Sequence, residues 1–177
     1  GTTGYMLNSL SFGWWLDRVY PFNDADHILL YQPKEAVDFK EGANRARITS
    51  AVITGIYMLG DNFSVKGRIP GAKEARDKAL AVATNKEIND IARKGKSFYP
   101  VEGYTAAGPG KTETIFMRDD DSHIYIAIFN FDKTENKTGI RDMGRVCTDR
   151  INNKQVKELW TSAQTVIRNN RLGYSIP

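Results

Sequence analysis

The sequence predicts an α/β region followed by an antiparallel β-sandwich, so the expected fold class is α/β plus all-β. Two observations support this prediction. Up to about residue 96, helical patterns alternate with short apolar runs, which is typical of parallel strands joined by helices. After Lys96, apolar residues recur at every second position, which is typical of short antiparallel strands. The predicted domains are therefore residues 1–96 and residues 97–177.

The first region has a strand–helix–strand pattern. Its expected elements are helices at about 5–19, 39–54, 72–83 and 86–93, and strands at 27–31 and 56–59. Both strands are continuous apolar runs, which predicts parallel strands buried on both faces. Two strands cannot form a stable parallel sheet alone, so this region is expected to be part of a larger fold.

The second region is predicted to contain only strands. A hairpin is expected from 112–118 and 122–130, with a polar turn at residues 119–121. Further strands are expected at 137–140, 156–160, 164–167 and 172–176. Short, closely spaced strands with polar turns indicate an antiparallel sandwich.

Composition narrows the classes of function. The 177 residues are 41% hydrophobic and 26% charged, with a net charge of +4 from basic and acidic residues that are mixed along the chain. Without a basic run, nucleic acid is not an expected partner. Apolar stretches stay well short of the ~20 residues of a membrane span. A single cysteine and two distant histidines, His27 and His123, give no reason to expect a metal or another cofactor.

Two local patterns imitate ligand-binding motifs. Residues 106–112 end like a phosphate-binding loop, but Thr105 stands where that motif has glycine, and a strand rather than a helix follows. A nucleotide-binding domain is therefore the less favoured interpretation. The three aspartates at 119–121 lack the glycine and distal glutamate of a calcium loop, so we expect a polar turn there.

The segment 23–27 (Asn-Asp-Ala-Asp-His) places two carboxylates and an amide directly before an apolar strand. Aromatic residues precede it at Trp14, Trp15, Tyr20 and Phe22. Aromatic faces beside carboxylates suit a sugar site, whereas the alternative is a capping cluster at a strand edge. Asp61, directly after the second strand, is equally compatible with a site residue of a barrel and with an ordinary turn.

Several segments, taken in order, resemble the clan of α-galactosidases and α-N-acetylgalactosaminidases, the melibiase-like glycoside hydrolases. Phe-Asn-Asp-Ala-Asp-His at 22–27 resembles the Trp-Asn-Asp-Pro-Asp-Met segment at barrel strand 7 of those enzymes. The other corresponding segments are 45–61, 83–91, 127–130 and 158–160. The match is collinear from about residue 20 to the end of the chain.

This resemblance implies the C-terminal portion of a retaining hydrolase of terminal α-linked galactosides or related sugars. Residues 1–96 would supply strands 7 and 8 of a (β/α)8 TIM barrel, and residues 97–177 a β-sandwich domain lacking its last strand. The substrate-binding residues carried over are Asp26 and His27. Phe22, Ala25 and His27 depart from the family pattern, which leaves sugar and linkage specificity open. The family uses neither metal nor cofactor.

The resemblance assigns no catalytic residue to this chain. The two catalytic aspartates of the family follow barrel strands 4 and 6, which are expected upstream of Gly1, so the chain alone is expected to be inactive. Its expected partners are a carbohydrate substrate and the rest of the barrel. Localisation is left open, with a periplasmic or extracellular parent compatible with the family. The alternative function is a non-catalytic carbohydrate-binding or structural β module.

Overall fold

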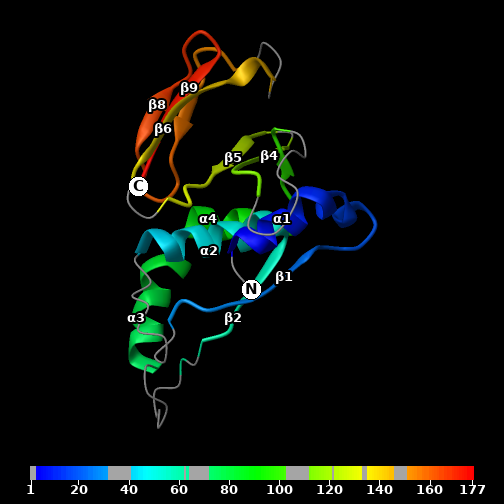
Figure 1. The fold of residues 1–177 in the computed structure, drawn as a ribbon, viewed down its shortest axis with the longest axis vertical. Helices are drawn as coiled ribbons and strands as arrows, with labels where there is room; N and C mark the ends of the chain where they lie inside the picture. The colour runs from blue at the N-terminus through cyan, green and yellow to red at the C-terminus, as the bar shows by residue number, and fades with distance from the viewer. Residues whose placement is uncertain are drawn as a thin grey trace. The chain divides into compact units, whose positions relative to one another are not determined.

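The structure is a computed structural model that describes residues 3–31, 41–61, 63, 72–102, 112–120, 122–132, 135–145 and 151–177. The chain forms two compact units, Gly1–Ala127 (unit 1) and Ile128–Pro177 (unit 2), each described by itself here. Figure 1 traces their elements along the chain.

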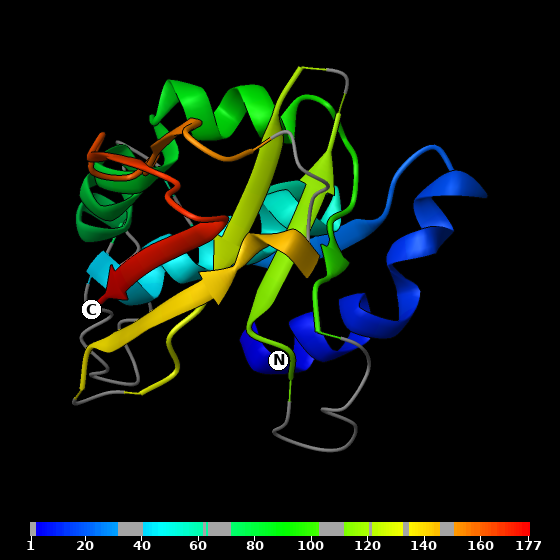
Figure 2. The ribbon, with the colours of Figure 1, turned by 90° about the horizontal axis from the view of Figure 1, so that it is seen from above.

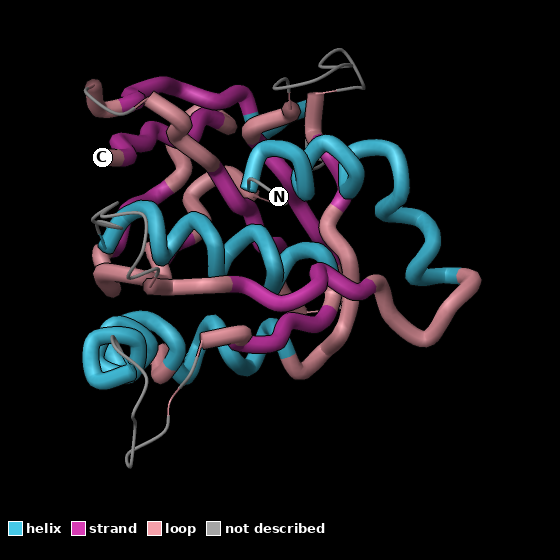
Figure 3. Tube along the Cα trace, turned by 60° about the horizontal axis from the view of Figure 1, so that its bottom comes forward, coloured by secondary structure: helices cyan, strands magenta, loops and turns pink. Residues whose placement is uncertain are grey.

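Unit 1 is built around one central helix. Its elements are α1 (Thr3–Gly13), the 3-10 helix η1 (Trp14–Arg18), β1 (Asp24–Ile28), α2 (Glu41–Thr54), β2 (Ile56–Leu59), α3 (Ala72–Ala83), α4 (Lys86–Ala92), β3 (Tyr99–Pro100), β4 (Ile115–Asp119) and β5 (Ile124–Ile128). Helix α2 packs against β1 and β2 and also contacts α1, α3 and α4 (Figure 3). Its side chains Ile48, Ala51 and Ile53 are at most 2% exposed, so this helix forms the centre of the core.

Strands β1 and β2 pair in parallel, as predicted. The predicted bounds of β2 are confirmed, whereas the predicted bounds of β1 (27–31) are wrong because the strand covers Asp24–Ile28. The physical reason lies at its end. The backbone N–H groups of Leu30 and Tyr31 donate to the Asp61 carboxylate rather than to a neighbouring strand.

The expectation that both strands are buried on both faces is also wrong for the part of the chain that the structure describes. In β1 only Ala25 and Ile28 are buried, and in β2 Met58 is 52% exposed. Helix α2 packs against both strands, and of the β2 side chains Met58 is the exposed one.

The helices follow their local signals. The predicted bounds of α3 are confirmed, and α4 begins after Asn85, whose side chain accepts a hydrogen bond from Ile88 N at 3.1 Å. Gly95 follows with φ +61°, as expected for a residue that ends a helix. The first predicted helix divides into α1 and the 3-10 helix η1.

A three-stranded sheet in unit 1 has the order β3–β4–β5. The β4 side chains Ile115, Phe116 and Met117 are at most 3% exposed, and because successive side chains of a strand alternate, β4 is buried on both of its faces. Strands β4 and β5 form the predicted hairpin. Its turn is closed by Asp120, whose backbone N–H donates to His123 O at 3.0 Å and whose carboxylate accepts from the backbone N–H groups of Ser122 and His123.

The described residues of unit 2 form two antiparallel strand pairs and a short 3-10 helix. Its elements are β6 (Lys137–Asp142), η2 (Met143–Arg145), β7 (Gln155–Lys157), β8 (Gln164–Val166) and β9 (Arg171–Ile176). Strands β6 and β9 pair antiparallel from Lys137 with Ile176 to Asp142 with Arg171 (Figure 2). Strands β7 and β8 form the second antiparallel pair.

The change of element type predicted near residue 96 is present, since the described elements after α4 are strands apart from η2. The two compact units divide later, between Ala127 and Ile128. Among the described residues, neither a closed barrel nor a sandwich is formed, so the TIM barrel, the sandwich and the domain bounds at 96 and 97 stay predictions.

Candidate functional site

The segment that the sequence singled out forms an irregular start to β1. Asp24 is paired with Ile56, but His27 is paired with Met58, so β1 has one more residue than β2 between these pairs. Asp26 lies in this interval with φ +60°, a conformation that few non-glycine residues adopt. Such bulges re-aim side chains, and they occur frequently beside functional sites.

Asp26 and His27, the two predicted substrate-binding residues, lie together at the surface. His27 Nδ1 is 2.9 Å from Asp26 Oδ1. The His27 side chain is 58% exposed and the Asp26 side chain 83%. The same carboxylate oxygen accepts the His27 backbone N–H at 2.7 Å. The hydrogen bond from the His27 backbone N–H is the main cause that holds the pKa of Asp26 below its ordinary value, and the contact with the imidazole is the next. The pair is therefore an ionised carboxylate joined to an accessible imidazole.

Asp61 joins the carboxyl ends of the two parallel strands. Its Oδ2 accepts from Leu30 N at 2.7 Å and its Oδ1 accepts from Tyr31 N at 3.0 Å. The sequence left two interpretations open for Asp61, a site residue of a barrel and an ordinary turn. This contact gives Asp61 a structural role and does not exclude either of them. The carboxylate satisfies two backbone donors that β1 would otherwise leave unpaired.

Helix α2 supplies two polar side chains to the same end of the sheet. The buried Asn44 donates from Nδ2 to Leu30 O at 3.3 Å, and Arg47 Nη1 donates to Asn44 Oδ1 at 3.1 Å. Burial lowers the pKa of Arg47, and the nearby Asp61 carboxylate opposes this shift. Arg47 is thus directed towards the strand ends, whereas Arg45 pairs with Glu41.

Gly60 brings His27 close to this group. A Cβ atom at Gly60 would lie only 2.5 Å from His27 Cδ2 and 3.1 Å from Cγ, so the imidazole occupies the space beside the glycine. The structure therefore gathers His27, Gly60 and Asp61 at the carboxyl ends of β1 and β2, with Asn44 and Arg47 behind them. We call these five residues and Asp26 the strand-end site.

Asn23 belongs to a different, buried network at the amino ends of the strands. Its Nδ2 donates to Ser97 Oγ at 2.9 Å, and Ser97 N donates to the buried Asp17 carboxylate at 2.9 Å. Ser97 Oγ also donates to Thr54 O. Asn23 and Asp17 therefore tie η1, α2 and the chain before β3 together, and their side chains are structural.

The aromatic residues that suggested a sugar site precede β1 in the chain. Trp15, Tyr20 and Phe22 are 46–60% exposed, and Trp14 packs against Tyr99 with ring centroids 5.5 Å apart. The aromatic segment leads into the amino end of β1. It therefore lies near Asn23, whose side chain donates to Gly13 O and Trp14 O, and not near Asp61. The sequence placed these aromatic residues beside Asp24 and Asp26, and their proposed role in stacking on a sugar stays a prediction.

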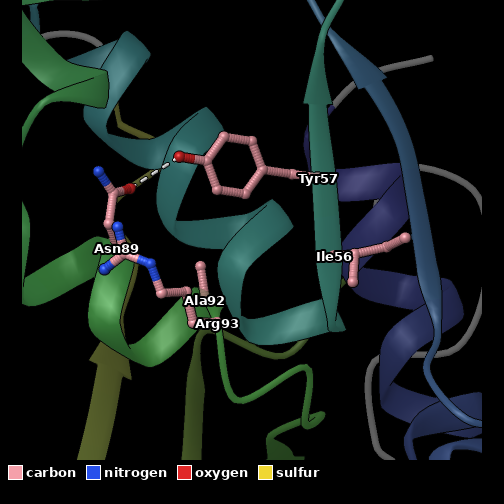
Figure 4. A pocket seen from close by; sticks show the side chains of 5 residues that line it. All are labelled: Ile56, Tyr57, Asn89, Ala92 and Arg93. Carbon is pink, nitrogen blue, oxygen red and sulfur yellow. Dashed lines mark hydrogen bonds between the residues drawn. The ribbon is translucent and has the colours of Figure 1, made fainter.

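A separate open hollow of about 340 Å³ lies between β2 and α4. It is lined by Ile56, Tyr57, Asn89, Ala92 and Arg93. Tyr57 projects from β2 towards α4, and its hydroxyl donates to Asn89 Oδ1 at 2.9 Å (Figure 4). Burial raises the pKa of Tyr57, and the charge of Arg93 partly opposes this. The hollow presents one phenol and one guanidinium, with no carboxylate for acid–base chemistry.

Replacing Tyr57 by phenylalanine is expected to lower the free energy of unfolding by about 1 kcal/mol near neutral pH, because the hydrogen bond to Asn89 is lost. Since the folded protein holds the Tyr57 proton more tightly than the unfolded chain, wild-type stability should fall as pH rises through about 10. The variant should show a smaller fall. Urea unfolding at pH 8 and pH 10.5 measures both effects, and equal falls in the two proteins would contradict the assignment.

Other predicted features are placed as follows. The loop at 106–112 lies outside the described residues except for Thr112, and so does Asp121. In the part of the chain that the structure describes, no group of three or more His, Cys, Asp and Glu side chains could hold a metal ion. None of the described helices is long and apolar enough to span a membrane.

Comparisons with protein-family models, curated proteins and solved structures give no significant match for this chain. The resemblance to the α-galactosidase clan therefore depends on the ordered sequence segments alone. The sequence pointed to Asp26 and His27 through the resemblance and left Asp61 open, and it missed Asn44 and Gly60. Asn44 carried a usable signal, since it lies at helical spacing from the core residues Ile48 and Ala51.

Proposed function

We propose that this chain is the C-terminal portion of a retaining α-galactosidase-like glycoside hydrolase. The strand-end site would form one wall of the pocket for a terminal α-linked galactoside or a related sugar. The observation that carries the proposal is the position of His27 and Asp61 at the carboxyl ends of two adjacent parallel strands. In barrel enzymes, residues at these ends line the active site.

The accessible apolar surface of unit 1 supports a larger parent fold. Parallel sheets occur with both faces covered, yet Met58 is 52% exposed on β2. Large apolar side chains are also exposed on α1, η1 and the segment that follows. They are Tyr5, Phe12, Trp15, Val19, Tyr20 and Phe22. Such a surface suits packing against the preceding strand–helix units of a barrel, which is the partner that we propose for it.

The chemistry of the strand-end site suits binding better than bond cleavage. A retaining glycosidase needs two carboxyl groups about 5–5.5 Å apart across the scissile bond, one as nucleophile and one as acid and base. Here the Asp61 carboxylate is occupied by two backbone N–H groups. Asp26 is held by His27. In the proposal both catalytic aspartates come from the preceding part of the parent protein.

Hydrolysis of an aryl α-galactoside tests this division of roles. The 177-residue chain is expected to release no phenol above the buffer rate, because it lacks the catalytic pair. The intact protein that contains the chain is expected to hydrolyse the substrate, and proton NMR should show that the first-formed galactose keeps the α configuration. Turnover by the 177-residue chain alone would overturn the proposed placement of the catalytic residues.

The second candidate is a non-catalytic carbohydrate-binding or structural module. Its support is that residues 128–177 form a compact unit of their own with two antiparallel strand pairs. A binding module should bind sugar unaided, whereas part of a barrel should bind weakly or not at all. Titration of the 177-residue chain with galactose, followed by amide NMR shifts, separates the two. Saturable shifts in unit 2 would favour the module.

A further inference from the structure

The net charge of the chain is not shared between the two units. Residues 128–177 contain nine lysines and arginines against five aspartates and glutamates, whereas residues 1–127 contain sixteen of each kind. The whole excess of +4 therefore belongs to unit 2. A small unit with an excess of one charge sign attracts partners of the opposite sign.

Two arginines of unit 2 lie directly opposite each other at the turn between β8 and β9. Arg171 N donates to Arg168 O at 2.9 Å, and Arg168 N donates to Arg171 O at 3.3 Å. The turn residues Asn169 and Asn170 have φ +50° and +56°, as a two-residue type I′ hairpin turn requires. Directly opposite residues project to the same face of an antiparallel pair, and like charges there repel each other. The turn therefore holds two arginine side chains on one face against their repulsion.

No acidic side chain of the described residues forms an ion pair with either arginine, and both arginines are exposed. Asp142, the strand partner of Arg171, accepts instead from Gly144 N at 2.8 Å. Glu158, which follows β7, accepts from two backbone N–H groups of the next turn. A bound anion would relieve the repulsion between the two arginines.

The arginine pair continues one face of the ribbon formed by β7 and β8. Val166 and Arg168 are exposed, whereas Ile167 between them is 4% exposed, so side chains alternate along this strand up to the turn. Every second residue of β8 and its partner in β7 lie on the same face, because directly paired residues share a face. We call this exposed surface the basic face, and it consists of Gln155, Lys157, Gln164, Val166, Arg168 and Arg171.

We infer that the basic face of unit 2 binds an anionic polysaccharide, with Arg168 and Arg171 holding one of its carboxylate groups. Arginine binds carboxylates through two parallel N–H bonds. The amides of Gln155 and Gln164 can both donate and accept, so they suit the sugar hydroxyl groups next to that carboxylate. This inference goes beyond the proposed hydrolase, because it concerns unit 2 and does not depend on hydrolysis by the parent protein. It gives the second candidate function an anionic ligand.

The composition of the basic face favours a glycan over a nucleic acid. The cations lie at its two ends, Lys157 at one and the arginine pair at the other, with uncharged side chains between them. A nucleic acid carries one charge at every nucleotide, and proteins that bind single strands also stack the bases on aromatic rings. The basic face contains no aromatic residue. Its mixture of cations and amides suits a polymer in which carboxylate groups alternate with hydroxyl groups.

Binding is tested with the 177-residue chain by amide NMR during titration with an oligogalacturonate, whose methyl ester is the uncharged control. We expect saturable shifts at the basic face and none with the methyl ester. The affinity should fall about tenfold or more between about 20 and 200 mM salt, because bound counterions are displaced. Absence of shifts at the basic face, equal binding of the methyl ester, or tighter binding of a DNA duplex than of the oligogalacturonate would overturn the inference.

Arg168→Gln combined with Arg171→Gln separates ligand binding from a structural role. Binding should weaken about tenfold, because charge-assisted hydrogen bonds are lost. The urea midpoint should stay the same or rise, because the repulsion between like charges is removed. Lys73→Gln combined with Lys86→Gln removes the same charge from exposed ion pairs of α3 and α4 and should leave the affinity unchanged. An arginine variant with unchanged affinity, or with weaker binding and a lower urea midpoint, would overturn the inference.

Discussion

Replacing Gly55 by alanine is expected to destabilise the protein by about 3 kcal/mol. Gly55 has φ +154°, and a Cβ atom there would lie 2.4 Å from the backbone oxygen of Asn23. That oxygen accepts the N–H of Ile56 at 3.1 Å, at the start of the parallel pairing of β1 and β2. Relief of the clash must therefore move the backbone that aligns both strands. Urea unfolding followed by tryptophan fluorescence measures the change.

Gly42→Ala is the matched control for this substitution. Gly42 lies in α2, and a Cβ atom there would meet nothing within 4 Å. Alanine is favoured over glycine in a helix, so this variant should be unchanged or more stable by up to about 1 kcal/mol. A Gly55→Ala protein as stable as Gly42→Ala would show that the strands do not approach as described.

Replacing Asp61 by alanine should cost about 3 kcal/mol, because the N–H groups of Leu30 and Tyr31 lose a charged acceptor and Leu30 is fully buried. The variant should also loosen the carboxyl end of β1, which carries His27. Urea unfolding gives the stability. Hydrogen exchange at Leu30 and Tyr31 gives the local effect, with faster exchange expected at both amides.

Asp77→Ala serves as the control for Asp61→Ala. Asp77 is an exposed residue of α3 that pairs with Lys73 one turn away, and exposed pairs of this kind contribute little to stability because solvent screens them. Asp61→Asn retains one oxygen acceptor and should lie between the wild type and Asp61→Ala. If Asp61→Ala proved no more harmful than Asp77→Ala, Asp61 would not hold the strand ends together.

Elements with local signals could be predicted from the sequence, and elements fixed by distant contacts could not. Asn85 and Gly95 mark the ends of the helical segment that contains α4, and both act through backbone conformation within a few residues. The end of β1 was misplaced because Asp61, about 30 residues further along the chain, takes the N–H groups of Leu30 and Tyr31. Hydropathy shows an apolar run at the end of β1, but it cannot show that the backbone N–H groups of this run donate to a side chain and not to a neighbouring strand.

The same distinction applies to the strand-end site. Asp26 and His27 were given a substrate-binding role because segment 22–27 resembles the strand 7 segment of the α-galactosidase clan, whereas the polar cluster alone left a structural alternative open. Gly60 could not be predicted, since its contribution is the absence of a Cβ atom beside a ring 33 positions earlier in the chain. Asn23 was part of the same polar cluster, yet its amide is used by Ser97, 74 residues away. Spacing within a motif does not separate such structural roles from ligand-facing ones.

The central claim is tested most directly by measuring hydrolysis of an aryl α-galactoside. The intact protein that contains this chain is compared with its His27→Ala variant. The proposed role of the strand-end site predicts hydrolysis with retention of configuration, and a raised KM in His27→Ala while both proteins unfold at similar urea concentrations. An intact, folded protein that hydrolyses no α-galactoside, or a His27→Ala variant with unchanged KM, would contradict the claim that these strand ends form a wall of a sugar site.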